Sequence, residues 1–595
     1  MSRVESKGKQ QAQAIKEAGG VMTHRQILFI IFGLMAGMFL SSLDQTIVGT
    51  SMRTIADDLK GLDAQAWVTT AYLITSTIAT PIYGKLSDIF GRRPLFIIAI
   101  IIFLIGSVAA GFSTSMYQLA GFRALQGLGA GGLMALPLAI MGDILAPRER
   151  AKYQGYFLAV FGVSSVIGPL IGGLFAGAPE ILFITGWRWV FLINLPIGIV
   201  ALAIVLRFLH IPHTRHAVRI DWWGAATVIL ALVPLLLVAE QGRTWGWDSL
   251  GSIACYVIGA LGVAAFIISE KLMGDDALIP LKLFKNATFR MATILGVLVG
   301  FGMFGAMLTI PLYLQLVNGA TPTESGFLML PMILGLMIAS IVSGQIIART
   351  GVYKWFPRAG TALMALGFLW FTFATADKPV WYMMIGMFLV GLGLGQLMQT
   401  LTIASQNSVG PRDIGVATSS STFFRQIGGT LGVAILFSVL YTRIPTAIAD
   451  AFTNKDTLAA LQTAATDPDV VADPANKGIL ALLQSAQGGD TSAVSDSLNG
   501  DSSFLNGADP RLTAPFLNGF NDAAVSIFWV ALAVVLVAFV LSWFLKATPL
   551  RAKSALQENA DNDAALSAKA AADQTGALVE PGGATSTDVT GSEKK

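Results

Sequence analysis

Long apolar runs separated by short polar segments make up most of this chain of 595 residues. Each run is at least about 18 residues long, which is enough to cross a hydrocarbon core of ~30 Å as a helix. A membrane β-barrel would instead show short segments in which apolar and polar residues alternate. The pattern predicts an all-α polytopic membrane protein with fourteen spans, at residues 27–49, 65–83, 95–112, 117–142, 153–176, 189–208, 222–240, 251–270, 288–316, 325–348, 356–374, 380–403, 416–441 and 520–546.

Lysine and arginine residues are concentrated in alternate loops between these spans, and such loops face the cytosol in helical membrane proteins. They are Lys85, Arg92 and Arg93; Arg148, Arg150 and Lys152; Arg207, Arg215 and Arg219; Lys271, Lys282, Lys285 and Arg290; Arg349, Lys354 and Arg358; and Arg412. The even number of spans and this charge pattern predict that both termini are cytosolic. The tail 1–26 is polar, and the tail 547–595 has a composition typical of disorder.

One outside loop, residues 442–519, is much longer than the others. It contains nine Asp, no Glu and four Lys or Arg. Asp473-Pro474 is typical of a helix start, because proline suits the first helical position. We expect a small, acidic and partly helical extracytoplasmic element here.

Composition supports the membrane class and excludes several activities. The chain is 54% hydrophobic and only 13% charged, whereas soluble domains carry about a quarter charged residues. The single Cys255 rules out an intramolecular disulfide and a cysteine-based metal site. No phosphate-binding loop of the G-x-x-x-x-G-K-[ST] type is present, and the four histidines form no catalytic constellation. We therefore expect no enzyme activity, no cofactor, no metal and no nucleic-acid partner.

The stretch GKLSDIFGRRP, residues 84–94, places several charges between two apolar runs. Its simplest interpretation is a positively charged inside loop with a tight turn. The spacing adds detail: Gly84 permits close helix approach, Asp88 lies near a helix terminus, and Gly91 allows the turn. Arg92 and Arg93 can form ion pairs at the membrane surface, and the following proline suits the first turn of a helix.

This stretch resembles the signature loop between helices 2 and 3 of the major facilitator superfamily. LAGFRALQGLGAG (119–131) resembles the helix 4 motif of that family, and SSVIGPLIGG (164–173) resembles its helix 5 antiporter motif, with serine for the first glycine. LDQTIVGTSMRTIA (43–56) resembles the helix 1 motif of the fourteen-helix drug:proton antiporters, and departs from it at Gly49 and Arg53. WRWVFLINLPIG (187–198) and the stretch from Arg425 to Gly429 fit the same subgroup.

The resemblance implies two six-helix bundles that rock about a central cavity, at 27–209 and at 287–441 with 520–546. Residues 220–272 would be two extra helices inserted between the bundles. GQIIARTG (344–351) parallels GKLSDIFG but lacks the acid, as a weak internal repeat would. By resemblance, Gly84, Asp88, Gly91, Arg92 and Arg93 form a conformational gate. The antiporter motif supplies Gly168, Pro169, Gly172 and Gly173, whose backbone permits close packing and a bend.

Charged residues inside the spans are costly and therefore indicate function. Asp44 could cap a helix near the interface, or could take up a proton or attract a cation. Arg123 could be an interfacial arginine, or a buried cation that tunes a proton acceptor, and Arg425 could be its equivalent in the second half. The family resemblance favours the functional interpretation of Asp44 and Arg123. Aromatic and amide residues that could line a cavity are Trp67, Tyr72, Gln126, Tyr313, Gln315, Gln396 and Gln399.

The leading prediction is a secondary exporter in a bacterial plasma membrane, which exchanges hydrophobic or cationic drug-like compounds for protons. A proton moving across 100 mV releases about 2.3 kcal/mol, so the proton gradient is a sufficient energy source. The alternative within transport is export of a lipid, glycolipid or other envelope component, with an envelope partner on loop 442–519. A membrane scaffold or sensor that does not transport is the third possibility.

Overall fold

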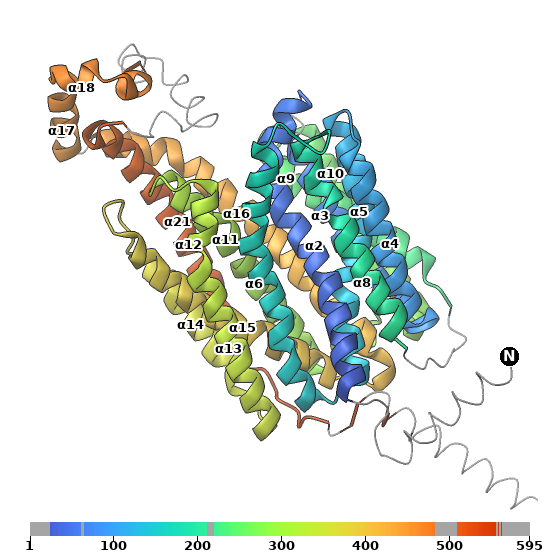
Figure 1. Ribbon diagram of the computed structural model, residues 1–595. Coiled ribbons are helices and arrows are strands. Elements are labelled where there is room, and N and C mark those ends of the chain that lie inside the picture. Colours follow the sequence, from blue (N-terminus) through green and yellow to red (C-terminus); the bar gives the residue numbers. More distant parts are fainter. Residues whose placement is uncertain are drawn as a thin grey trace, which may run out of the picture.

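In the computed structural model of this chain, the described residues are 24–60, 65–210, 219–453, 455–481, 508–551 and a few positions between 553 and 561. Long helices run side by side through most of this part of the chain, as Figure 1 shows. The predictions for residues 1–23, for most of the C-terminal tail and for the middle of the long loop fall outside the described residues.

The N-terminal half consists of α2 (His24–Asp58), α3 (Gln65–Phe90), α4 (Arg92–Gly111), α5 (Met116–Ile144), α6 (Pro147–Gly177), α7 (Trp189–Leu192) and α8 (Asn194–Phe208). In this half α2 packs against α6, and α5 packs against both α3 and α4. Glycines permit these contacts: a side chain on Gly129 or Gly132 of α5 would overlap α4.

The C-terminal half repeats this arrangement. It consists of α11 (Ala287–Leu316), α12 (Pro322–Leu328), α13 (Leu330–Thr350), α14 (Trp355–Phe371), α15 (Val380–Asn407), α16 (Ile414–Thr453) and α21 (Pro510–Ser542). Here α11 packs against α16, and α15 packs against both α13 and α14. The helix pairs correspond one to one with those of the N-terminal half, as expected for an internal repeat.

The two halves meet along two helix pairs, α3 with α16 and α6 with α13. Two further helices, α9 (Trp222–Trp245) and α10 (Leu250–Met273), lie between the halves in the sequence and pack against each other. Side chains of α9 join a buried cluster with Ile74 and Ile78 of α3 and Phe423 of α16. The inserted pair therefore covers the seam between α3 and α16, with α10 on its outer side.

Twelve helices of the described residues are long and apolar enough to cross a membrane. The other two helices at predicted spans are α14, which has 17 residues, and α3, which is rich in threonine. All fourteen predicted spans fall on helices of the structure, but the count of fourteen crossings stays a prediction, as do the proposed domain boundaries.

Two predicted spans are interrupted where a proline removes a backbone donor. The span 189–208 divides into α7 and α8, because Pro196 has no N–H for the carbonyl of Leu192. The span 325–348 divides into α12 and α13 ahead of Pro331 in the same way, and α12 begins earlier than predicted, at a capping box formed by Thr321 and Glu324.

A small β-hairpin departs from the all-α prediction. Strands β1 (Glu180–Ile181) and β2 (Ile184–Thr185) pair in antiparallel register after α6. Leu182 and Phe183 form the two-residue turn with positive φ, as hairpin turns of this length require. The hairpin is too short to change the fold class.

The long loop begins later and ends earlier than the sequence predicts. The helix α16 continues to Thr453 and α21 starts at Pro510, so both helices extend beyond the bundle (Figure 1). Between them, α17 (Lys455–Thr466) packs against α21, and α18 (Pro468–Ala472) follows it. The predicted helix start at Asp473-Pro474 is confirmed, since the Asp473 side chain accepts a hydrogen bond from the Ala475 backbone N–H.

Candidate functional site: a buried charge cluster and a closed end

The N-terminal half encloses an ion pair between α2 and α5. The Nη1 atom of Arg123 lies 2.5 Å from Oδ2 of Asp44, and the two side chains are 2% and 0% exposed. Gln126 bridges the pair: its Oε1 accepts from Arg123 at 2.7 Å, and its Nε2 donates to Oδ1 of Asp44 at 2.8 Å. The predicted coupling residues Asp44 and Arg123 are thus in direct contact.

Three further helices contribute to this cluster. Asn194 of α8 donates to Oδ1 of Asp44 at 2.7 Å and to the Ser107 hydroxyl of α4 at 2.9 Å. Tyr72 of α3 lies under the guanidinium of Arg123, with 4.0 Å between Cζ and the ring centroid, and its hydroxyl meets that of Ser41. Five helices are therefore tied to one carboxylate and its counterion.

Asn194 and Ser107 are not among the site residues that the sequence predicts. Asn194 begins α8 directly after the helix break, which places its amide inside the half beside Asp44. A polar amide within an apolar run was the available signal, because buried polar groups need partners. Which partner it finds depends on how α8 packs against α2, and the sequence does not show that.

The gate residues lie at the end of the molecule where α3 ends and α4 begins, here called the motif end. Arg92 contacts two carboxylates, with Nη2 2.5 Å from Oδ1 of Asp88 and Nε 2.6 Å from Oδ2 of Asp143. The other oxygen of Asp88 accepts from the backbone N–H of Val416 in α16 at 3.1 Å. Asp88 thus links the N-terminal half to the C-terminal half. Asp143 is a partner that the sequence analysis did not identify.

Asp88 lies beyond the predicted span 65–83 of its helix. Burial raises its pKa to about 6; Arg92 lowers the pKa and the neighbouring Asp143 raises it. Since two carboxylates share one guanidinium, protonation of Asp88 leaves Arg92 with Asp143 as its partner.

Two glycines place the halves in close contact at the motif end. A Cβ atom on Gly84 of α3 would overlap the side chain of Ser419 in α16. A Cβ atom on Gly344 of α13 would overlap the backbone carbonyl of Ala151 in α6. These glycines occupy the same position in GKLSDIFG and GQIIARTG, and each stretch ends in a glycine with positive φ, 97° at Gly91 and 70° at Gly351. The sequence repeat therefore corresponds to two equivalent contacts between the halves.

Further polar contacts close the motif end. Arg150 at the start of α6 is fully buried and donates to Gln406 of α15 and to the carbonyls of Gly142 and Leu145. Gln399 of α15 donates to the carbonyl of Ala151 at 2.6 Å. Arg93 is directed elsewhere, since it donates to the carbonyl of Leu206 in α8. Arg92 is thus part of the contact between the halves, and Arg93 is not.

The predicted antiporter motif in α6 has two different faces. Gly168 and Gly172 pack against α2, where a Cβ atom on Gly168 would overlap Thr46. The Ser51 hydroxyl donates to the carbonyl of Gly172 at 3.0 Å. Pro169 and Gly173 instead lie next to α12 in the other half. The motif joins the helix that carries Asp44 to the interface between the halves.

The seven residues predicted to line a cavity are not brought together. Tyr72 and Gln126 belong to the charge cluster, and Gln399 belongs to the contact at the motif end. The Tyr313 hydroxyl donates to Asn521 inside the C-terminal half, because α11 and α21 pack together there. The others are also separate: Trp67 lies against Trp245, Gln315 donates to Ser325, and Gln396 donates to its own helix at Leu392.

Arg425 of α16 is separate from the charge cluster. It is 9% exposed, and no acidic side chain among the described residues lies within 4.0 Å of it. Arg425 therefore differs from Arg123, because no described acidic residue lies beside it as Asp44 lies beside Arg123.

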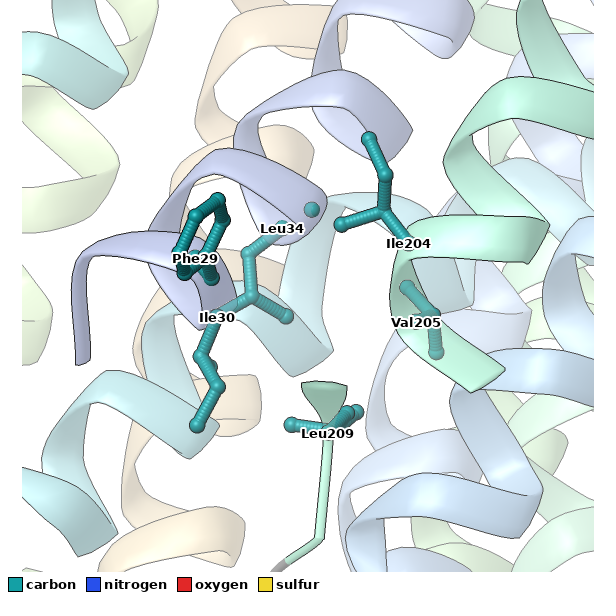
Figure 2. Close-up of a pocket in the computed structure, with 7 residues that line it drawn as sticks. Phe29, Ile30, Leu34, Ile204, Val205 and Leu209 are labelled. Atoms are coloured by element: carbon teal, nitrogen blue, oxygen red, sulfur yellow. The ribbon is translucent and has the colours of Figure 1, made fainter. Parts of the chain in front are cut away.

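A shallow apolar crevice lies between α2 and α8, as Figure 2 shows. Its walls are Phe29, Ile30 and Leu34 on one helix and Ile204, Val205 and Leu209 at the other. Ligand sites usually add a few polar groups that fix orientation. This crevice offers no such side chain, so it does not qualify as the substrate site.

Two packed helical halves with a buried ion pair and glycine-mediated contacts define a class, the multi-pass membrane transporters built from internal repeats. The sequence model of the Major Facilitator Superfamily matches residues 34–433, and the chain belongs to that superfamily. It is therefore a multi-pass membrane transporter rather than an enzyme, as predicted.

Known proteins resemble the chain over most of its length. Multidrug transporter protein MdtP of Bacillus subtilis (strain 168) is 40% identical over 415 residues, which cover 70% of this chain and 75% of that protein. Multidrug resistance protein 3 of the same organism is 36% identical over 428 residues, which cover 72% and 80%. The solved structure of the proton:xylose symporter XylE has a TM-score of 0.54 at 13% identity, over 88% of this chain and 97% of that one, and supports the fold alone.

Proposed function

We propose that this protein exports small hydrophobic drug-like compounds across a bacterial plasma membrane in exchange for protons. Two relatives that are named for multidrug transport or resistance support the choice of substrate. The basic loops at the motif end support an orientation with that end and both termini in the cytosol.

The observation that carries the proposal is the buried cluster around Asp44. A carboxylate that is 0% exposed and paired with Arg123 inside the half is costly to build, since desolvation opposes the pair. Ionisable groups within membrane spans mark substrate or ion pathways and proton relays. When Asp44 takes up a proton, it loses its charge, and the attraction that joins α2 to Arg123 of α5 weakens.

We further propose that the halves alternate access around the seams α3–α16 and α6–α13. Closure at the motif end involves Asp88, Val416, Arg150 and Gln406 across the halves. Opening of this end must break these contacts, while protonation of Asp44 loosens the packing of α2 within its own half. Each pH unit of the gradient adds about 1.4 kcal/mol to the driving force.

The test uses purified protein in proteoliposomes with an imposed pH gradient. Movement of a panel of fluorescent hydrophobic compounds and the accompanying proton flux are measured together. Asp44→Asn is expected to abolish proton-coupled transport. Asp57→Asn is the matched control on the same helix, because Asp57 is exposed at the end of α2. Normal coupled transport by Asp44→Asn at equal reconstitution would contradict the proton role.

Lipid export by way of the long loop stays a prediction. The same proteoliposomes separate it from drug export: a response to labelled lipid without a response to any drug would favour envelope export.

A further inference from the structure

Within the predicted spans of the N-terminal half, the one carboxylate is Asp44, and it is not free to hold a cationic compound. Asp44 is 0% exposed, and its oxygens accept from Arg123, Gln126 and Asn194. Its charge is balanced by Arg123, so the cluster as a whole is neutral. The expectation that Asp44 attracts a cationic substrate is therefore not favoured by this arrangement.

The C-terminal half, in contrast, contains a positive charge that has no counterion among the described residues. Arg425 is the twelfth residue of α16, so it lies about 16 Å along that helix from its first residue. That depth is near the middle of a hydrocarbon core of ~30 Å. No hydrogen bond of its side chain to the described residues is found, and no described acidic group lies within 4.0 Å.

The stretch of α16 that carries Arg425 lies at the seam between the halves, because Phe423 of this stretch packs with Ile74 and Ile78 of α3. The next residue, Gln426, accepts a hydrogen bond from Thr80 of α3 at 3.2 Å. On the other side, α11 of the same half approaches at Gly300, where an added Cβ atom would overlap the backbone oxygen of Arg425 and lie 3.1 Å from its Cγ. The glycine thus lets α11 pack against the backbone of α16 at Arg425 and against the first part of the arginine side chain. In transporters built from repeats, substrate sites lie near the midplane at the interface of the repeats.

An uncompensated guanidinium at this depth is expensive, and a buried charge is normally paired. We propose that Arg425 is an anion-binding subsite for the transported compound, and that it takes a carboxylate, sulfonate or enolate group. The apolar part of the compound then lies between the two halves. This inference rests on the proposed export function and refines its substrate class, from hydrophobic compounds in general to anionic or zwitterionic ones.

The test is equilibrium binding to the full-length protein in nanodiscs, and it needs no transport. The probes are 8-anilino-1-naphthalenesulfonate and N-phenyl-1-naphthylamine, which share one aromatic skeleton and differ in the sulfonate. The wild type is expected to bind the sulfonate at least about tenfold more tightly after subtraction of binding to empty nanodiscs. A tenfold preference corresponds to about 1.4 kcal/mol.

Arg425→Gln is expected to remove this preference and to leave the affinity for the neutral amine within about twofold. Arg425→Lys keeps the charge and is expected to retain most of the preference. Arg349→Gln is the matched control, since Arg349 is an exposed arginine in the last turn of α13. Equal affinity of the wild type for the two probes, or a preference that survives Arg425→Gln, would overturn the inference.

The outcomes also separate this inference from the export function. Proton-coupled transport without a sulfonate preference would retain export and remove the anion subsite. A sulfonate preference lost in Arg425→Gln, in a protein that moves no protons, would support the subsite and contradict the proposed exchange.

Discussion

Asp44 and Arg123 show how a costly interaction is retained inside a membrane protein. Both charges are buried, and Gln126 and Asn194 donate to Oδ1 of Asp44, the oxygen that the arginine does not contact. A buried pair of this kind adds little stability compared with an apolar pair of the same size, but the loss of one partner leaves the other charge exposed to the low dielectric. The presence of this ion pair therefore indicates a function that needs a carboxylate whose charge can be neutralised.

A double-substitution experiment tests this dependence. Arg123→Gln alone is expected to lower the free energy of unfolding by about 3–5 kcal/mol, because Asp44 stays buried without its counterion. The double variant with Asp44→Asn is expected to recover at least half of that loss, because neither charge remains. Thermal unfolding in detergent measures both. Simple addition of the two single effects would show that the pair is not coupled.

At the scale of helices, contact between the halves depends on the absence of side chains. Gly84 lets α3 approach α16, and Gly344 lets α13 approach α6. The two contacts differ in one respect: Gly84 faces a side chain, Ser419, whereas Gly344 faces the backbone of Ala151. Only the first contact can be restored by a change in the partner residue.

Gly84→Ala is therefore expected to disfavour the closed motif end by about 1–3 kcal/mol, through overlap with Ser419. Ser419→Gly in the same protein is expected to restore closure. Gly121→Ala is the control, because open space surrounds that position in α5. Distances between spin labels at the exposed positions Glu149 and Lys354, in a Cys255→Ser background, report on closure. An unchanged distance distribution in Gly84→Ala would contradict the role of this contact.

For the molecule as a whole, the proposed alternation makes the closed motif end one state of a conformational equilibrium. Asp88, Arg150 and Gln399 make contacts across the halves in this structure, and under the proposed alternation these contacts break when the motif end opens. Any group whose proton affinity changes on closure links that equilibrium to pH. Asp88 is such a group, because burial at the closed interface raises its pKa.

The sign of the pH effect follows from that shift. The pKa of Asp88 is about 6 when closed, and would return toward its ordinary value near 3.8 in water, so the closed form binds the proton more tightly. Lowering the pH from 7 to 5 is expected to raise the closed-to-open ratio by about tenfold through this residue. The spin-label pair at Glu149 and Lys354 measures the ratio, and Asp88→Asn is expected to lack this part of the response. A shift toward the open form on acidification that disappears in Asp88→Asn would refute the assignment.

Local properties of the sequence determined the membrane class, the positions of the helices and the positions of the motif glycines. Hydropathy and length act within one segment, so each predicted span falls on a helix. The same applies to Gly91, whose positive φ follows from a turn between two adjacent helices. The family resemblance added that Asp44, Asp88 and Arg123 matter, and it implied the charge contact between Asp88 and Arg92 that the structure contains. It did not name the partners of Asp44.

Packing alone decided the partners. Asp44 meets Arg123 and Asn194, which lie 79 and 150 positions away in the chain, and Asp88 meets Val416, 328 positions away. Such contacts depend on which helix faces turn toward each other, and the apolar spans of this chain are too alike to reveal it. The same packing placed Tyr313 inside one half, directed Arg93 to α8 and left Arg425 without a counterion among the described residues. The sequence therefore determined which residues are exceptional in a membrane, and the tertiary structure decided what each of them contacts, because burial and pairing are properties of the assembled helices.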